Sequence, residues 1–493
     1  MRGLFSGILW KFVEKVLSQM VTFVVSVVLA RILLPSEYGI IAKVTIFITI
    51  ADVLVTTGLA SSLIQKKDVS ENDFSTMFYV NMVFSLLLYS ILFVTAPVIG
   101  VFFGDSRLIQ VLRVLSGKIL LSAYISIQQA YISKYMLFRK SAIVSLFATI
   151  SSAIVGIVLA YQGCGVWALV WQQLSFAMTQ VVLFTVFINW RPRCCFSFSR
   201  ARSMIGFGNQ VLFAGVLDTI GAQIKTVIIG KCYSDNELAY YNRGDLYPQL
   251  LISSISGALH TVLFAAYSQE QDRLDAVKEI MRKGVRRGCF VVFAMLVGLA
   301  CVAHPLVEVM LTSKWLPCVP YLQIACIAYC TWPIQIVQQE AIIGLGYGKD
   351  YLMITISRVT FNLVALLALA QQGIIWISVG VIMVSLFSTF LVCKWTKEKL
   401  NYRYKEQVED ILPAIVNSVI IFVAVRVVSV FNLPVVIELI LGIFAGVIGT
   451  VLHSFLTRNE TFFWAIYKIK SIKGPYGKEK NHRIESRNKG VKK

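Results

Sequence analysis

The segment LARILLPSEYGIIA, at residues 29–42, links two long apolar runs at 12–34 and 39–64. Each run is long enough to cross a bilayer as a helix, which takes about 20 mostly apolar residues. We therefore predict that the segment forms the tight turn of a helical membrane hairpin.

Similar apolar runs continue along the rest of the chain. The fourteen candidate spans are 12–34, 39–64, 74–103, 112–137, 141–161, 166–188, 204–229, 246–269, 288–312, 319–346, 351–371, 374–393, 411–431 and 434–456. Of the 493 residues 57% are hydrophobic and only 15% are charged, whereas soluble domains average about 25% charged residues. We predict an all-α polytopic membrane protein with about 14 transmembrane helices, which excludes disordered and ordinary soluble chains.

The charges predict the orientation of the chain. Lys and Arg number 46 against 26 Asp and Glu, giving a net charge of +20. The alternate loops that begin after the second span hold 21 of these cations and the other loops hold 6. The positive-inside rule puts the first set and both termini in the cytoplasm. The cations then face the inner leaflet, so the expected partners are anionic membrane lipids rather than nucleic acid.

The hairpin turn has a counterpart 200 residues later, IGKCYSDNELAYYN at 229–242, which aligns Glu37 with Glu237. A second pair, VFFGDSRLIQVLRVL at 101–115 and VMLTSKWLPCVPYLQ at 309–323, is offset by 208. Six spans in each half give both halves the same orientation, as in the parallel repeats of transporters. The predicted parts are a first six-helix bundle at 1–190, a second at 191–410, two additional helices at 411–456 and a basic cytoplasmic tail at 457–493.

Polar stripes run along the first two spans of each half. Polar groups at membrane depth are costly and usually face a cavity or another helix. The steps of three and four residues put each stripe on one helix face, so we expect one shared central cavity. The candidate cavity residues are Lys11, Lys15, Lys43, Lys225, Gln249 and His260, with Lys118 of the fourth span as a further candidate.

Asp52 and Asp218 are the candidate ion-coupling residues, because a desolvated carboxyl group can titrate near neutral pH. The alternatives remain open. Either aspartate could instead form a permanent salt bridge with Lys43 or Lys225. The Ser and Thr residues of the stripes could serve only helix packing. Lysines near span ends could extend to the lipid headgroups.

Enzyme and metal motifs are missing from the sequence. It contains no GxxxxGK[ST], HExxH or GxSxG motif, and the loops between spans are shorter than about 20 residues, too short for a catalytic domain. The four histidines are scattered and the ten cysteines include no CxxC pair. We therefore expect no catalytic residues, no cofactor and no metal.

Four segments resemble the polysaccharide transporter family, the Wzx-type flippases of lipid-linked oligosaccharides. They are Gly7-Ile8-Leu9-Trp10, LARILLPSEYG at 29–39, GLASSLIQKKD at 58–68 and KWLPCVPYLQI at 314–324. The resemblance implies the fold of multidrug exporters of the MATE type and of lipid II flippases, in which spans one, two, seven and eight line a cavity between two six-helix bundles.

The resemblance also implies the substrate, an undecaprenyl-diphosphate-linked oligosaccharide flipped across the bacterial cytoplasmic membrane for O-antigen, capsule or exopolysaccharide synthesis. The polymerase and the glycosyltransferases of that synthesis are the expected protein partners. Lysines could neutralise the diphosphate, which carries about two negative charges that cannot cross hydrocarbon alone. Lipid II flippases present arginines around the cavity, so the lysines here depart from their pattern. The alternatives are a MATE-like, ion-coupled exporter of small amphiphilic compounds and a non-transporting scaffold of a polymer-synthesis complex.

Overall fold

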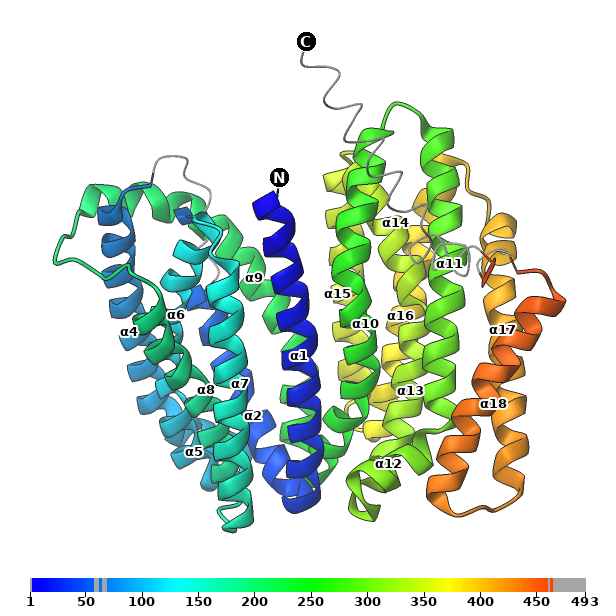
Figure 1. Cartoon of the computed structure of the whole chain (residues 1–493), viewed down its shortest axis with the longest axis horizontal. Helices are drawn as coiled ribbons and strands as arrows, with labels where there is room; N and C mark the ends of the chain where they lie inside the picture. The colour runs from blue at the N-terminus through cyan, green and yellow to red at the C-terminus, as the bar shows by residue number, and fades with distance from the viewer. Residues whose placement is uncertain (1, 57–61, 64–68, 460–461, 464–493) are drawn as a thin grey trace. The chain divides into compact units, whose positions relative to one another are not determined.

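The computed structural model describes residues 2–56, 62–63, 69–459 and 462–463, and every regular element in these ranges is a helix. The elements are α1 (Arg2–Ile32), α2 (Pro35–Thr56), α4 (Glu71–Phe103), α5 (Arg107–Leu115), α6 (Gly117–Lys134), α7 (Phe138–Tyr161), α8 (Val166–Phe187), α9 (Phe198–Cys232), α10 (Asp235–Gln269), α11 (Leu274–Cys301), α12 (Ala303–Leu311), η1 (Ser313–Cys318), α13 (Val319–Cys330), α14 (Trp332–Gly344), α15 (Gly348–Leu369), α16 (Ile374–Leu400), α17 (Tyr404–Val430) and α18 (Val435–Leu456). The predicted all-α class is confirmed (Figure 1).

Each of the fourteen predicted spans falls mainly on helix where the structure describes it, and residues 57–61 and 64 of the second span lie outside the described residues. Within the described ranges, 11 stretches of helix are long and apolar enough to cross a membrane. The predicted spans at 204–229, 246–269 and 319–346 are not among them. Several side chains of α9 and α10 lie outside the described part of the structure. The predicted span 319–346 is divided at Thr331 into the short helices α13 and α14. The chain is a multi-pass membrane protein, and the count of fourteen spans stays a prediction.

The first turn of each half has the same construction. α1 ends at Ile32 and α2 begins at Pro35, while α9 ends at Cys232 and α10 begins at Asp235, so both boundaries repeat at the offset of 200 seen in the sequence. In each turn a glutamate carboxylate accepts a backbone N–H three residues earlier. These hydrogen bonds join Leu34 to Glu37 at 2.8 Å and Ser234 to Glu237 at 3.0 Å. Each glutamate thus satisfies a backbone donor at a helix start.

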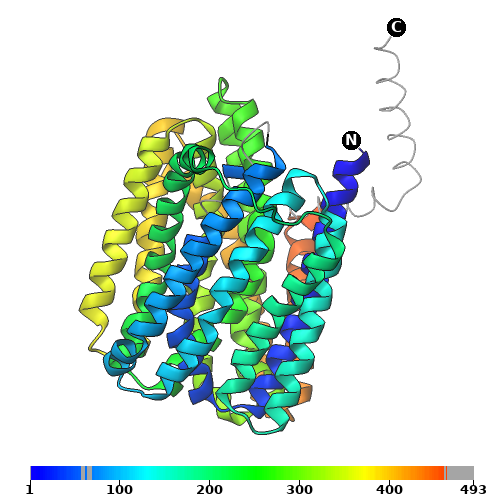
Figure 2. The same ribbon diagram turned by 90° about the vertical axis from the view of Figure 1, so that its left-hand side faces the viewer.

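The chain divides into two compact units. Unit 1 contains residues 1–243, 310–317 and 366–374, and unit 2 contains the remainder. The core of unit 1 joins α2, α4, α5, α6 and α8, with Ile48, Phe103, Leu112 and Ile119 among its buried side chains. Within each unit, neighbouring long helices are packed along one another (Figures 1 and 2).

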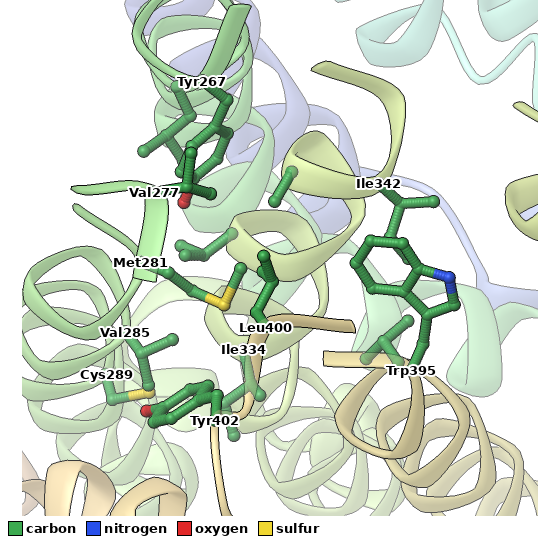
Figure 3. Close-up of a cluster of buried hydrophobic side chains, with 14 of the residues drawn as sticks. Tyr267, Val277, Met281, Val285, Cys289, Ile334, Ile342, Trp395, Leu400 and Tyr402 are labelled. Carbon is green, nitrogen blue, oxygen red and sulfur yellow. The ribbon is translucent and has the colours of Figure 1, made fainter. Parts of the chain in front are cut away.

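The core of unit 2 is built from α10, α11, α14 and α16. Tyr267, Met281, Ile334 and Trp395 belong to this cluster (Figure 3). Tyr402, in the short link before α17, closes the cluster and is fully buried. Burial raises the pKa of the Tyr402 hydroxyl, and the nearby Asp410 carboxylate adds to this effect. The hydroxyl therefore stays protonated and donates a hydrogen bond to Asp410 at 2.9 Å.

A polar network joins α17 to α11 in unit 2. The buried Asp410 carboxylate accepts hydrogen bonds from Arg282 at 2.7 Å and from Arg286 at 2.6 Å. One turn away, Glu406 pairs with Lys278 at 2.8 Å and with Arg282 at 3.3 Å. The first of the two additional helices is thus held by charge as well as by apolar packing.

Replacing Asp410 by asparagine is expected to destabilise the protein by about 3 kcal/mol, because two guanidinium groups would lose their buried partner. Thermal unfolding of the detergent-purified protein measures the effect. Glu279→Gln is the matched control, since it neutralises a carboxylate on α11 that pairs with Lys283 at the surface, and such pairs are worth about 0.5 kcal/mol or less. Equal melting temperatures for the two variants would show that the network does not hold α17.

Candidate functional site

A partly open pocket lies in unit 1 between α2, α6 and α8, and one face of α6 supplies most of its polar groups. Lys118, Ser122, Ser126, Gln129 and Ser133 follow one another at steps of three or four residues, so they share a helix face. With residues of the other two helices they enclose a volume of about 290 Å³. The other lining residues are Thr56, Ile125, Ala130, Phe176, Ala177 and Gln180.

Lys118 and Asp52 form an ion pair beside this pocket. The Lys118 ammonium lies 3.2 Å from Oδ2 of Asp52, and the two side chains are 25% and 22% exposed. Oδ1 of Asp52 is buried and has no hydrogen-bond partner among the described residues. An ammonium group carries three donors, so pairing with one carboxylate oxygen leaves Lys118 able to bind a further acceptor.

Several lining groups have unused hydrogen-bonding capacity. Gln180 and Ser122 are both 8% exposed, yet neither forms a side-chain hydrogen bond within the described ranges. Ser126 is engaged, because it accepts from Asn81 at 3.3 Å. Buried polar groups are normally paired. Free amide and hydroxyl groups beside an ammonium make the pocket suited to a ligand that offers both hydroxyl groups and negative charge.

The other predicted site residues of unit 1 differ in their burial and in their partners. Lys43 is buried and pairs with Asp235 at 2.6 Å. Lys225 is half-buried on α9, with its ammonium 5.5 Å from the ring centre of Tyr241. Lys15 is exposed on α1. The side chains of Lys11 and Asp218 lie outside the described part of the structure.

Unit 2 contains the two remaining predicted residues, both on α10. Gln249 and His260 are exposed, and His260 Nε2 lies 3.6 Å from a carboxylate oxygen of the buried Glu340 on α14. Their assignment to a substrate site stays a prediction.

The partners of Asp52 and Lys43 differ from the salt bridges considered in the sequence, whereas the alternative of an Asp218–Lys225 pair falls on a side chain outside the described part of the structure. Asp52 pairs with Lys118, while Lys43 pairs with Asp235 at the start of α10. Asp235 also lies 3.4 Å from Arg107, which binds Asp105 at 2.8 Å. Burial opposes ionisation of Asp105, but the hydrogen bonds from Arg107 outweigh it and hold the pKa of this carboxyl below its ordinary value.

The sequence analysis did not identify the polar face of α6 that runs from Lys118 to Ser133. Only Lys118 stood out, because serines in an apolar helix are common and carry little signal alone. The signal that was available is the sequence of polar residues from Lys118 to Ser133 at steps of three and four. What the sequence could not provide is the neighbouring face of α8 that completes the pocket.

A family profile described as polysaccharide biosynthesis protein matches residues 28–320, which include Asp52, Lys118 and Gln180. The chain belongs to this family. Thus the resemblance found in the turn segments is confirmed over more than half of the chain.

Three curated relatives carry related names. The chain is 21% identical over 328 residues to the teichuronic acid biosynthesis protein TuaB of Bacillus subtilis, covering 66% of this chain and 68% of the relative. It is 22% identical to the succinoglycan biosynthesis transport protein ExoT of Rhizobium meliloti, over 62% of each chain. It is 21% identical to the lipopolysaccharide biosynthesis protein WzxC of Escherichia coli, over 65% of this chain and 66% of the relative. The matched regions thus span about two thirds of the relatives' lengths.

Solved structures show the same fold. The lipid II flippase MurJ, in an inward closed conformation, matches with a TM-score of 0.72 at 14% identity, over 92% of this chain and 99% of that chain. An inward-facing MATE family multidrug transporter matches with a TM-score of 0.61 at 12% identity, over 78% and 94%. The predicted fold, shared by the lipid II flippases and the MATE transporters, is confirmed.

Proposed function

We propose that this protein is a flippase that moves an undecaprenyl-diphosphate-linked oligosaccharide across the bacterial cytoplasmic membrane by alternating access. The observation that carries the proposal is the pocket of unit 1, which places Lys118 beside the amide of Gln180 and the hydroxyl of Ser122 within a bundle of apolar helices. Membership of the polysaccharide biosynthesis family and the names of the relatives support the substrate class.

The two parts of the substrate call for different groups. Sugar hydroxyls suit neutral donors and acceptors such as Gln129, Ser133 and Gln180, which line the pocket. The diphosphate needs a positive charge, and Lys118 is the lining residue that can supply one. We assign Lys15 and Lys225 a supporting role as further counter-charges, while Lys43 is engaged by Asp235.

The MATE-like exporter of small amphiphilic compounds is the weaker candidate. A site for cationic compounds should be net acidic, whereas the carboxylate of Asp52, which lies beside this pocket, is neutralised by Lys118. The curated relatives are named for polysaccharide and lipopolysaccharide synthesis rather than for drug export.

Energy coupling is proposed for Asp52 and Asp218. An asparagine mimics the neutral, ion-loaded carboxyl at nearly constant volume, so Asp52→Asn and Asp218→Asn should retain substrate binding and lose the response to a proton or sodium gradient. Gradient-driven flipping in reconstituted vesicles measures this, together with membrane abundance. Wild-type gradient dependence in both variants would remove these residues from the coupling site.

We propose that both termini are cytoplasmic. Single cysteines at Ser486 and Gln162, in a cysteine-free background, test the orientation with a membrane-impermeant thiol reagent. Gln162 directly follows the last residue of α7 and is exposed, so it should react from outside intact cells, whereas Ser486 should react only after permeabilisation. Labelling of Ser486 in intact cells would contradict the orientation.

Cells that lack the protein should lose the surface polysaccharide and accumulate its lipid-linked precursor at the inner leaflet. Expression of the wild-type chain should restore the polymer. If the polymer were unaffected by the deletion, or if the precursor did not accumulate, the flippase proposal would fail.

A further inference from the structure

Arg358 of unit 2 lies at the middle of α15, a helix long and apolar enough to cross the membrane. It comes 10 residues after Gly348, where α15 begins, and 11 residues before Leu369, where it ends. At a rise of about 1.5 Å per residue, Arg358 is about 15 Å from either end, which is half the thickness of the hydrocarbon core. An arginine stays ionised in proteins, so the helix carries a permanent charge near the bilayer centre.

The guanidinium side of α15 is the packed side of the helix. Arg358 is partly buried. On the same side, Tyr351 and Ile354 join the core of unit 2, and Phe361 stacks on Phe387 of α16 with a ring distance of 4.4 Å. Exposed apolar side chains lie about 100° or more away around the helix axis, among them Leu352, Ile356, Val359, Leu363 and Leu367. Arg358 therefore points away from the side of α15 that suits contact with lipid.

Two further polar side chains accompany Arg358. Thr355 comes three residues before it and Asn362 four residues after it, so all three share one helix face. Both are partly buried. Within the described part of the chain, none of the three side chains has a hydrogen-bond, ion-pair or ring partner. Together they offer guanidinium, hydroxyl and amide donors to one acceptor.

A purely structural role does not account for this arginine. Arginines near helix ends can extend to the lipid headgroups, but Arg358 is at the midpoint of its helix. A structural salt bridge would need a carboxylate, and Arg358 has none among the residues that the structure describes. Polar groups on the packed side of a membrane helix are normally paired or face a ligand or water. The three unpartnered side chains therefore indicate a binding site for an anion.

We propose that Arg358, Thr355 and Asn362 form a subsite at the middle of the membrane that binds the diphosphate group of the transported glycolipid, a role that depends on the proposed flippase function. Lys118 shares its charge with Asp52, so that pair is neutral as a whole. Arg358 supplies a positive charge that no described carboxylate offsets, and a guanidinium group can bind phosphate oxygens in a bidentate manner. It places this charge at the depth where an anion is most costly.

Binding of undecaprenyl diphosphate and of uncharged undecaprenol to the detergent-purified full chain, measured by native mass spectrometry, tests the subsite. Arg358→Gln should weaken binding of the diphosphate at least about tenfold. Binding of undecaprenol should not change, because the alcohol carries no charge. Arg426→Gln is the matched control, since Arg426 is an exposed arginine of another membrane-spanning helix, α17. This variant should bind both lipids as the wild type does.

Thermal unfolding of the lipid-free protein separates binding from folding. Arg358 has no described partner to lose, and an unpaired charge at membrane depth is costly. Arg358→Gln should therefore melt at or above the temperature of the wild type. A lower melting temperature would assign Arg358 a structural role and overturn the subsite.

Two binding results would also overturn the subsite. Equal binding of undecaprenyl diphosphate by the wild type and by Arg358→Gln would remove Arg358 from substrate recognition and leave the flippase proposal standing. Equal losses in Arg358→Gln and Arg426→Gln would reduce the effect to general attraction by cations of the protein. If the wild type bound neither lipid, the flippase proposal itself would fail, and the subsite with it.

Discussion

Cells that carry Lys118→Met are expected to lose at least about nine tenths of their surface polysaccharide. Among the described residues that line the unit 1 pocket, Lys118 alone carries a positive charge. A charge-assisted hydrogen bond is worth about 1.5–3 kcal/mol, which corresponds to roughly ten- to hundredfold in binding. Quantification of the polymer on whole cells, alongside the amount of protein in the membrane, measures the effect.

The Asp52→Asn/Lys118→Met double variant separates transport from folding. Lys118→Met alone leaves the carboxylate of Asp52 without its described partner, and an unpaired charge at membrane depth lowers stability. The double variant removes both charges together, so its abundance should return to that of the wild type while transport stays lost. Normal polymer output from the double variant would show that the pair has only a structural role.

The second large effect is expected for Gly39→Ala, which should prevent accumulation of folded protein. Gly39 lies on α2 directly against the backbone of Asp235, and a Cβ atom at this position would overlap the Asp235 carbonyl group. A backbone carbonyl at a helix start cannot move aside as a flexible side chain can. The substitution would also displace the Lys43–Asp235 ion pair, since the two contacts share one residue.

Gly221→Ala is the matched control for this change. Gly221 also lies inside a helix, α9, but among the described residues no neighbouring side chain or packed helix comes within 4 Å of the position of an alanine methyl group. Alanine has a higher helix propensity than glycine by about 1 kcal/mol, so this variant should be as abundant as the wild type or slightly more so. Membrane abundance and the gel-filtration profile of both variants check the comparison, and a well-folded Gly39→Ala protein would show that the close approach is not required.

The sequence predicted the helical fold and the repeat because both depend on local patterns. Apolar runs of sufficient length locate the spans, and the turn at Glu37 recurs at Glu237 with the same hydrogen bond to the start of the next helix. The number of membrane spans is harder to predict, because the break at Thr331 divides an apolar run that is continuous in the sequence.

The charge partners could not be predicted, because helical spacing assigns a residue to a face but does not identify the neighbouring helix. Asp52 was considered with Lys43 or Lys225, yet its partner Lys118 comes from the fourth predicted span, on α6. The pocket of unit 1 depends in the same way on α8, whose Gln180 gave no distinct signal in an apolar helix.

Flipping of a fluorescent undecaprenyl-diphosphate-linked oligosaccharide in reconstituted vesicles tests the central claim most directly. A membrane-impermeant quencher reports the fraction of labelled glycan on the outer leaflet. The account predicts protein-dependent translocation by the wild type and none by the Asp52→Asn/Lys118→Met variant at equal protein content. Export of a small cationic dye without movement of the glycan lipid would contradict the account and favour the multidrug exporter.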